Sequence, residues 1–174
     1  MSTHNFDYDF FVIGGGSGGV RAARIAAGHG AKVGLAESHK LGGTCVNVGC
    51  IPKKLMAITA DFGMGFDDAR GFGWNAENIR FDWAQFMHAK DAEISRLNGI
   101  YENLLNKTGV TLHTGHARFI DEHTIDVAGA HVTADKILIA VGGTPRRPSY
   151  PGSEHAITSD EFFFLKDRPQ RVLI

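Results

Sequence analysis

The sequence predicts an α/β domain built on a parallel sheet, with a small antiparallel β-meander added to it. One observation is the order strand, glycine turn, helix, strand and acidic residue within the first 37 residues. Another is a long helical pattern over about residues 82–107, where apolar residues recur at steps of three and four. From about residue 110 to 141 the pattern changes to short strands separated by turns, which predicts the meander.

The first strand is expected at residues 9–13, an apolar run that ends at glycines and suits a buried parallel strand. The alanine-rich residues 20–27 are good helix formers, and glycines follow where a helix would end. The second strand is expected at residues 31–36, with Glu37 at its C-terminal end. Residues 61–75 are rich in Gly, Phe and Asp and are expected to form a loop.

The domain organisation follows from length and from the two ends of the chain. The 174 residues suffice for one domain with a core, expected over residues 1–168. Residues 171–174 look like the opening of a strand, so the fold is expected to be incomplete at the C-terminus, with residues 169–174 starting a truncated second domain.

Composition excludes several classes of function. The sequence is 43% hydrophobic and 21% charged, as in ordinary soluble proteins, and its net charge of -1 gives no reason to expect a nucleic-acid or membrane-surface partner. No signal peptide and no bilayer-spanning stretch is visible. We therefore expect a cytoplasmic protein, in which a structural disulfide is disfavoured.

The glycines Gly14, Gly16 and Gly19 match the pattern G-x-G-x-x-G, with Glu37 eighteen residues after the last of them. The predicted strand before the pattern and the helix after it supply the context that a Rossmann-like dinucleotide site requires. Glycine permits a close approach to a pyrophosphate, and the helix N-terminus offers free N–H groups. Glu37 can accept hydrogen bonds from a ribose diol and would repel a 2′-phosphate, so this loop should not hold NADP. A glycine turn without a ligand is the alternative.

Both cysteines, Cys45 and Cys50, lie in the segment LGGTCVNVGCIPKK. A disulfide that closes so short a loop would contribute only about 2 kcal/mol. A zinc site needs more ligands at closer spacing, so no metal is expected. Two buried, unreactive thiols remain the alternative to a reactive pair.

The surroundings of the cysteines favour reactivity. Thr44 suits a helix N-cap, and Pro52 suits the first turn of a helix after Cys50. Lys53 and Lys54 bring positive charge, and both a helix N-terminus and a lysine lower a thiol pKa.

The segment from Gly42 to Lys54 resembles the redox-active signature of the flavin-dependent pyridine nucleotide-disulfide oxidoreductases, and the resemblance extends from the Gly14 loop to Ile174. It implies that FAD occupies the first dinucleotide loop and that NADPH binds a later domain. The positions that match FAD contacts of the family are Gly14, Gly16, Ser17, Gly18, Gly19, Glu37, Gly43, Thr44, Cys45, Lys53, His116, Ala117, Ala140 and Gly142.

The resemblance also implies a mechanism. NADPH passes a hydride to FAD, which reduces the disulfide between Cys45 and Cys50. Cys50, nearer the flavin, forms the charge-transfer thiolate, Cys45 attacks the substrate disulfide, and Lys53 stabilises negative charge on the reduced flavin. The full-length protein is expected to be a homodimer whose partner subunit supplies a His–Glu acid pair. The isolated 174 residues lack the later domains, so they are expected to bind FAD weakly or not at all and to show no NADPH-dependent turnover.

Within the family, the Lys53–Lys54 pair and the short connection from Glu37 to Gly42 resemble the glutathione reductases, which implies glutathione disulfide as the substrate. The positions implied in binding it are Ser17, Arg24, Ile100 and Tyr101. A solvated helix face is the alternative for Arg24, and the core face of the long helix is the alternative for Ile100. A trypanothione or thioredoxin reductase, or a non-catalytic FAD-binding fragment, remains open as another function.

Overall fold

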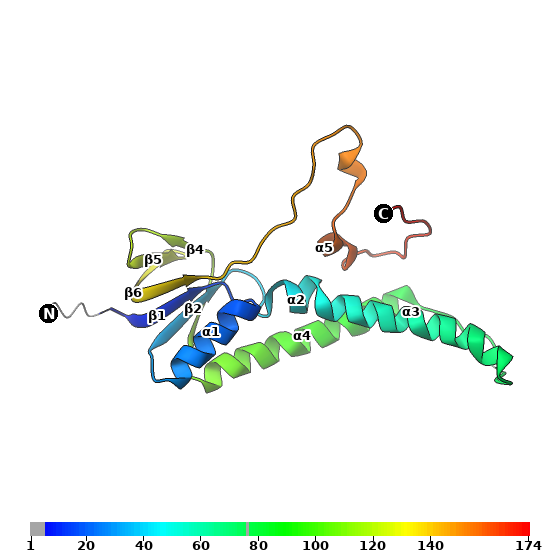
Figure 1. The fold of residues 1–174 in the computed structure, drawn as a ribbon, viewed down its shortest axis with the longest axis horizontal. Helices are drawn as coiled ribbons and strands as arrows, with labels where there is room; N and C mark the ends of the chain where they lie inside the picture. Colours follow the sequence, from blue (N-terminus) through cyan, green and yellow to red (C-terminus); the bar gives the residue numbers. More distant parts are fainter. Residues whose placement is uncertain (1–5, 76) are drawn as a thin grey trace.

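The computed structural model describes residues 6–75 and 77–174. Within these residues, six strands form one sheet in the order β3-β2-β1-β6-β5-β4 (Figure 1). The strands are β1 (Tyr8–Ile13), β2 (Val33–Glu37), β3 (Thr111–Thr114), β4 (Ala117–Phe119), β5 (Thr124–Val127) and β6 (Ala130–Ile139). The pairs β3–β2, β2–β1 and β1–β6 are parallel, whereas β6–β5 and β5–β4 are antiparallel. The expected mixed architecture is confirmed.

The central strand β1 is buried on both faces, which is why its sequence is continuously apolar. Phe11 and Ile13 point to one face, where they pack in a cluster with residues of β5 and β6. Val12 points to the other face, where it packs in a cluster with residues of α1 (Ser17–Gly28) and α4 (Trp83–Lys107). The two helices therefore cover one face of the sheet, and the meander covers the other.

The meander is smaller than the sequence predicted. Its first expected strand is divided at Gly115, whose φ of +147° is unfavourable for other residues. The part before Gly115 is β3, which pairs parallel with β2 instead of joining the meander. The meander therefore comprises β4, β5 and β6, and β6 belongs to both parts of the sheet.

Two helices follow the second strand, α2 (Gly43–Val48) and α3 (Cys50–Gly71). The expectation of a loop at residues 61–75 is wrong for most of that stretch, because α3 continues to Gly71. An isolated glycine costs a helix about 1 kcal/mol but does not stop it. The helix ends where Gly73 adopts a φ of +83° and the N–H of Trp74 bonds back to the Ala69 carbonyl at 3.1 Å.

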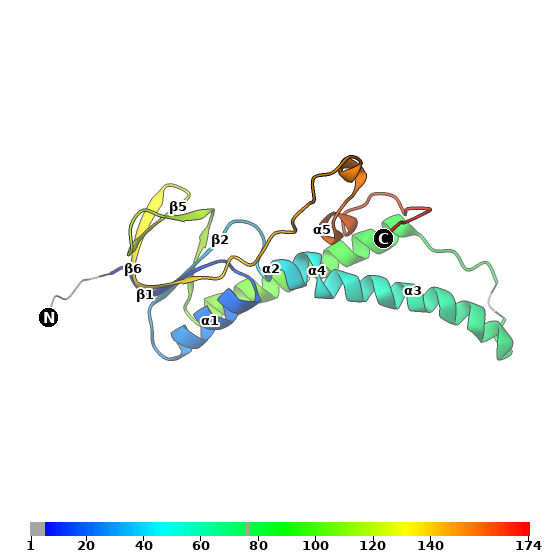
Figure 2. The ribbon, with the colours of Figure 1, turned by 45° about the horizontal axis from the view of Figure 1, so that its top comes forward.

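Helices α3 and α4 form a long pair that projects away from the sheet (Figures 1 and 2). After β6 the chain leaves the sheet as an extended strap, residues 141–152, and passes a short 3₁₀ turn, η1 (Ser153–His155). It then returns to the helix pair at α5 (Ser159–Phe162). Among the described residues, none of the helices combines the length and the apolar character needed to cross a membrane.

Candidate active site

The glycine loop joins β1 to α1 at the C-terminal edge of the parallel strands. At Gly19 an added Cβ would lie 1.9 Å from the Gly14 carbonyl oxygen, and at Gly14 it would lie 2.3 Å from the Ala140 oxygen. Both contacts are with backbone, so only glycine permits this packing of helix, loop and strand. Gly16 precedes α1 in an extended conformation and no side chain caps the helix, which leaves its N–H groups available to an anion.

Glu37 is hydrogen-bonded to the glycine loop. Its Oε2 accepts a hydrogen bond from the Gly15 N–H at 2.7 Å, and its Oε1 accepts one from the His39 N–H at 2.8 Å. Each carboxylate oxygen has a second acceptor position. Glu37 therefore stabilises the loop and still has capacity for a ribose diol.

The cysteines lie on either side of a helix break. Cys45 is half-buried in α2, and Cys50 is exposed at the first residue of α3. Between them Gly49 breaks the helix, and an added Cβ there would lie 2.8 Å from the Thr44 carbonyl oxygen. Both cysteines are free thiols in the structure.

Two expectations about this segment need correction. Thr44 is not the N-cap of α2, because Gly42 takes that position with a φ of +98° and the helix begins at Gly43. The pKa of the Cys45 thiol is raised, not lowered, because Cys45 hydrogen-bonds to Cys50 and is partly desolvated. The charge of Lys53 acts in the opposite direction on that pKa and is outweighed.

One cleft of about 1340 Å³ brings most of the predicted cofactor positions together. The predicted residues that line it are Gly14, Gly16, Ser17, Gly18, Glu37, Gly43, Thr44, Cys45, Cys50, His116, Ala117, Ala140 and Gly142. Backbone hydrogen bonds hold the more distant segments in place, from the Ala140 N–H to the Ile13 carbonyl at 2.8 Å and from the Gly115 N–H to the Glu37 carbonyl at 2.9 Å. The ends of β1, β2, β3 and β6 thus meet at this cleft, as expected for parallel strands.

Five predicted residues are not among those that line this cleft. Gly19 is buried at the contact of α1 with β1, and Lys53 is exposed one turn beyond Cys50. Arg24 is exposed on α1, and Ile100 is 39% exposed on α4. Tyr101 packs against the core cluster beneath α1. The substrate roles of the last three remain predictions.

A pair of asparagines that the sequence analysis missed holds the segment before the cysteines. Asn98 on α4 donates from Nδ2 to the Leu41 carbonyl at 2.8 Å and to Asn47 Oδ1 at 3.0 Å. Asn47 in turn donates from Nδ2 to the Gly43 carbonyl at 2.9 Å. Local sequence gives no signal for this pair, because its members are 51 residues apart.

The fold is that of a Rossmann-like dinucleotide-binding domain, and a cysteine pair lies at its cleft. The family model for pyridine nucleotide-disulphide oxidoreductases matches residues 8–174, and the chain belongs to that family. The chain is 49% identical over 169 residues to a glutathione reductase of Burkholderia cepacia and 48% identical over 169 residues to one of Nostoc sp.. It is 42% identical over 180 residues to the chloroplastic/mitochondrial glutathione reductase of Pisum sativum. Each alignment covers 97% of this chain but only 33–38% of the relative, so the chain spans about a third of these proteins.

Proposed function

We propose that this chain is the FAD-binding part of a glutathione-disulfide reductase in which Cys45 and Cys50 form the redox-active pair. The observation that carries the proposal is a single cleft lined by the glycine loop, Glu37 and both cysteines. The names of the relatives support glutathione disulfide as the substrate.

The cleft fits a bound FAD. The glycine loop and the cysteine segment approach so closely that a Cβ on Gly43 would lie 2.7 Å from Gly16 Cα. Such a cradle suits a pyrophosphate at the uncapped start of α1. Glu37 would hold the adenosine ribose, with the adenine against His116 and Ala117.

The flavin end of the same ligand is assigned to the other side of the cleft. Thr44 and Cys45 would lie beside it, and Ala140 and Gly142 would form the opposite edge. Lys53 would approach the flavin ring from the first turn of α3. These roles rest on the family resemblance and on the positions of the residues around the cleft.

Bound FAD would supply the electron pair that opens the disulfide between Cys45 and Cys50. The Cys45 sulfur would then attack one sulfur of glutathione disulfide, forming a mixed disulfide and releasing one glutathione. The Cys50 sulfur would attack the Cys45 sulfur, releasing the second glutathione and restoring the Cys45–Cys50 disulfide. The raised pKa of Cys45 means that this thiol would have to give up its proton as it attacks, because the thiolate is the nucleophile.

The proposal also includes NADPH as the reductant and a homodimer as the assembly. It further assigns four residues of this chain to contacts with the substrate. Arg24 is assigned to a carboxylate of glutathione, and its exposure on α1 leaves its guanidinium free to reach a ligand. Ser17, Ile100 and Tyr101 are assigned to the same substrate site by resemblance.

A chimera tests the function. Residues 8–174 would replace the matching segment of the Burkholderia cepacia enzyme, which supplies the rest of the protein. We expect the purified chimera to hold FAD and to reduce glutathione disulfide with NADPH. Cys45→Ser and Cys50→Ser should retain FAD and lose turnover. A chimera that folds and holds FAD but reduces trypanothione disulfide in preference to glutathione disulfide would refute the substrate assignment.

A further inference from the structure

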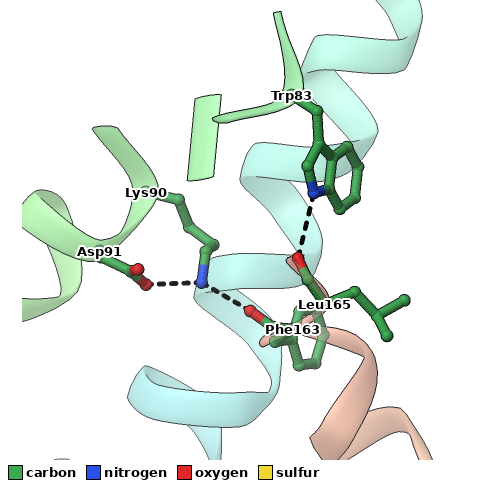
Figure 3. Close-up of polar contacts among 5 residues, drawn as sticks. All are labelled: Trp83, Lys90, Asp91, Phe163 and Leu165. Atoms are coloured by element: carbon green, nitrogen blue, oxygen red, sulfur yellow. Dashed lines mark hydrogen bonds and ion pairs between the residues drawn. The ribbon is translucent and has the colours of Figure 1, made fainter. Parts of the chain in front are cut away.

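Lys90 is a buried cation on α4, with only 3% of its surface exposed. Burying an ammonium group is costly unless it is paired and hydrogen-bonded. Its Nζ donates to the Phe163 carbonyl at 2.8 Å and to Asp91 Oδ1 at 2.7 Å (Figure 3). The same ammonium lies 5.4 Å from the centroid of the Phe164 ring, within the range of a cation–π contact.

Trp83 makes a second contact of this kind. Its Nε1 donates to the Leu165 carbonyl at 3.0 Å (Figure 3). Trp83 and Lys90 are seven residues apart, so they lie two turns apart on one side of α4. We call these two side chains, with the carbonyls of Phe163 and Leu165 that they hold, the α4 clamp.

The clamp fixes the residue between its two carbonyls. The Phe163 side chain is buried, whereas that of Phe164 is 60% exposed. Phe164 lines the cleft that also contains Asp91, Cys45 and Cys50. The preceding strap, residues 141–152, is exposed along its length and forms an ion pair with α5 from Arg147 to Glu161. It offers little packing that could hold Phe164 in the cleft.

We propose that Lys90 is a positioning residue: through the α4 clamp it holds Phe164 as a wall of the cleft that also contains the cysteines, and thereby limits which reagents reach them through that cleft. The inference rests on the proposed function only in taking Cys45 and Cys50 as the reactive pair.

Alkylation rates of the reduced 174-residue chain test this inference. The probes are iodoacetamide, which is small, and N-(1-pyrenyl)maleimide, which is bulky, with the modified cysteine identified by peptide mass. In Lys90→Met, loss of a charge-assisted hydrogen bond should raise the rate with the bulky probe by about tenfold. The rate with the small probe should change little. Lys90→Arg keeps a cationic donor and should react like the wild type.

The matched controls separate the clamp from a general loss of charge. Lys166→Met removes an exposed lysine next to the clamp and should leave both rates unchanged. Phe164→Ala should reproduce the Lys90→Met rate, and the double variant should add nothing to it, because both changes remove one barrier. If Lys90→Met fails to fold by circular dichroism, Trp83→Phe, which removes only the other clamp donor, takes its place.

Two outcomes would overturn the inference. One is an unchanged rate with the bulky probe in both Lys90→Met and Phe164→Ala, and the other is independent, additive effects in the double variant. Alkylation needs neither FAD nor turnover, so an inactive chimera combined with the expected alkylation rates would refute the proposed function alone.

Discussion

The two cysteines differ in surroundings although only four residues separate them. Cys45 lies within α2 and is half-buried, whereas Cys50 opens α3 in contact with solvent. Gly49 permits this arrangement, because its φ of -147° and ψ of -117° interrupt the helix and its missing side chain leaves room for the Thr44 carbonyl. The pair therefore has one shielded and one accessible sulfur.

The Cys45 thiol provides a prediction at the residue scale. Its pKa is raised first of all by the hydrogen bond to Cys50, so Cys50→Ala should lower that pKa. Lys53→Met should raise it, because the lysine charge favours the thiolate. The measurement is the pH dependence of iodoacetamide alkylation at Cys45, followed by peptide mass in the wild type and in each variant.

Lys54→Met is the matched control for the Cys45 titration. It removes the same charge one residue away, and Lys54 is not among the groups that shift the pKa of Cys45. A Cys45 titration that does not respond to the loss of Cys50 would contradict the predicted origin of the raised pKa.

At the residue scale, sequence reasoning brought together residues whose positions depend on neighbours along the chain. Gly14, Gly16 and Glu37 follow the ends of two strands, and their spacing was enough to place them in one cleft. Asn98 and Phe164 reach the same region by tertiary contacts over more than 50 residues. The spacing of residues along the sequence gives no information about such contacts.

The turn between β5 and β6 is strained at one position. Ala128 and Gly129 form a two-residue hairpin loop, and both have positive φ, at 51° and 90°. A type I′ turn requires this geometry and favours Asn-Gly over Ala-Gly. The alanine therefore adopts a backbone conformation that is unfavourable for its side chain.

Replacing this alanine should stabilise the fold. Ala128→Asn should raise the free energy of unfolding by about 1 kcal/mol, because asparagine tolerates the left-handed conformation better. Urea denaturation would measure the change. Gly129→Ala is the opposite control: its Cβ would meet no atom within 4 Å, so any loss of stability reports backbone strain alone. Equal stability of all three chains would refute strain at this turn.

Helices and strands whose apolar residues recur with a regular period were predicted well from the sequence, whereas α3 was not. The long helix was expected at about residues 82–107 and is α4, because its apolar spacing records the side that is buried. The second half of α3 is largely exposed, so it carries no such pattern, and its glycines suggested a loop. Likewise, β3 looked like part of the meander because strand pairing partners are not visible in a local pattern.

Across the whole sheet, a part-buried aromatic contact links β1 to β3. Tyr8 Oη lies 2.8 Å from His113 Nε2, although β2 separates their strands. Gly34 on β2 leaves room for this contact, since an added Cβ there would lie 2.6 Å from the Phe11 ring. Burial lowers the pKa of His113 from its ordinary value of 6.5.

The lowered pKa predicts how stability depends on pH. In the unfolded chain His113 binds its proton at a higher pH than in the folded chain, so acidification favours unfolding. The contribution of neutral His113 to the stability of the fold is complete when the pH is above the pKa that this histidine has in the unfolded chain. It is lost as the pH falls from about 7.5 to 5.5 and below. Urea denaturation across this range should show a shallower loss of stability for His113→Gln than for the wild type.

Other groups act in a different pH window. The pKa values of Asp7, Asp121 and Asp126 are lowered below 3.8, chiefly by backbone hydrogen bonds, so their contribution is lost only under more acidic conditions. Parallel slopes for the wild type and His113→Gln between about pH 7.5 and 5.5 would rule out the histidine as the source.

The position of β6 beside β1 affects how the chain can be synthesised. The register of this pair runs from Tyr8 opposite Ala134 to Ile13 opposite Ile139. The centre of the sheet therefore pairs the first strand in the sequence with the last one. During translation, β1 and β2 emerge early, and one edge of β1 remains unpaired until more than 90 further residues have been added. An open, apolar edge of this kind is a template for pairing with other chains. The nascent protein is thus most exposed to aggregation before β6 has emerged, and it closes that edge with its own chain only at the last strand of the sheet.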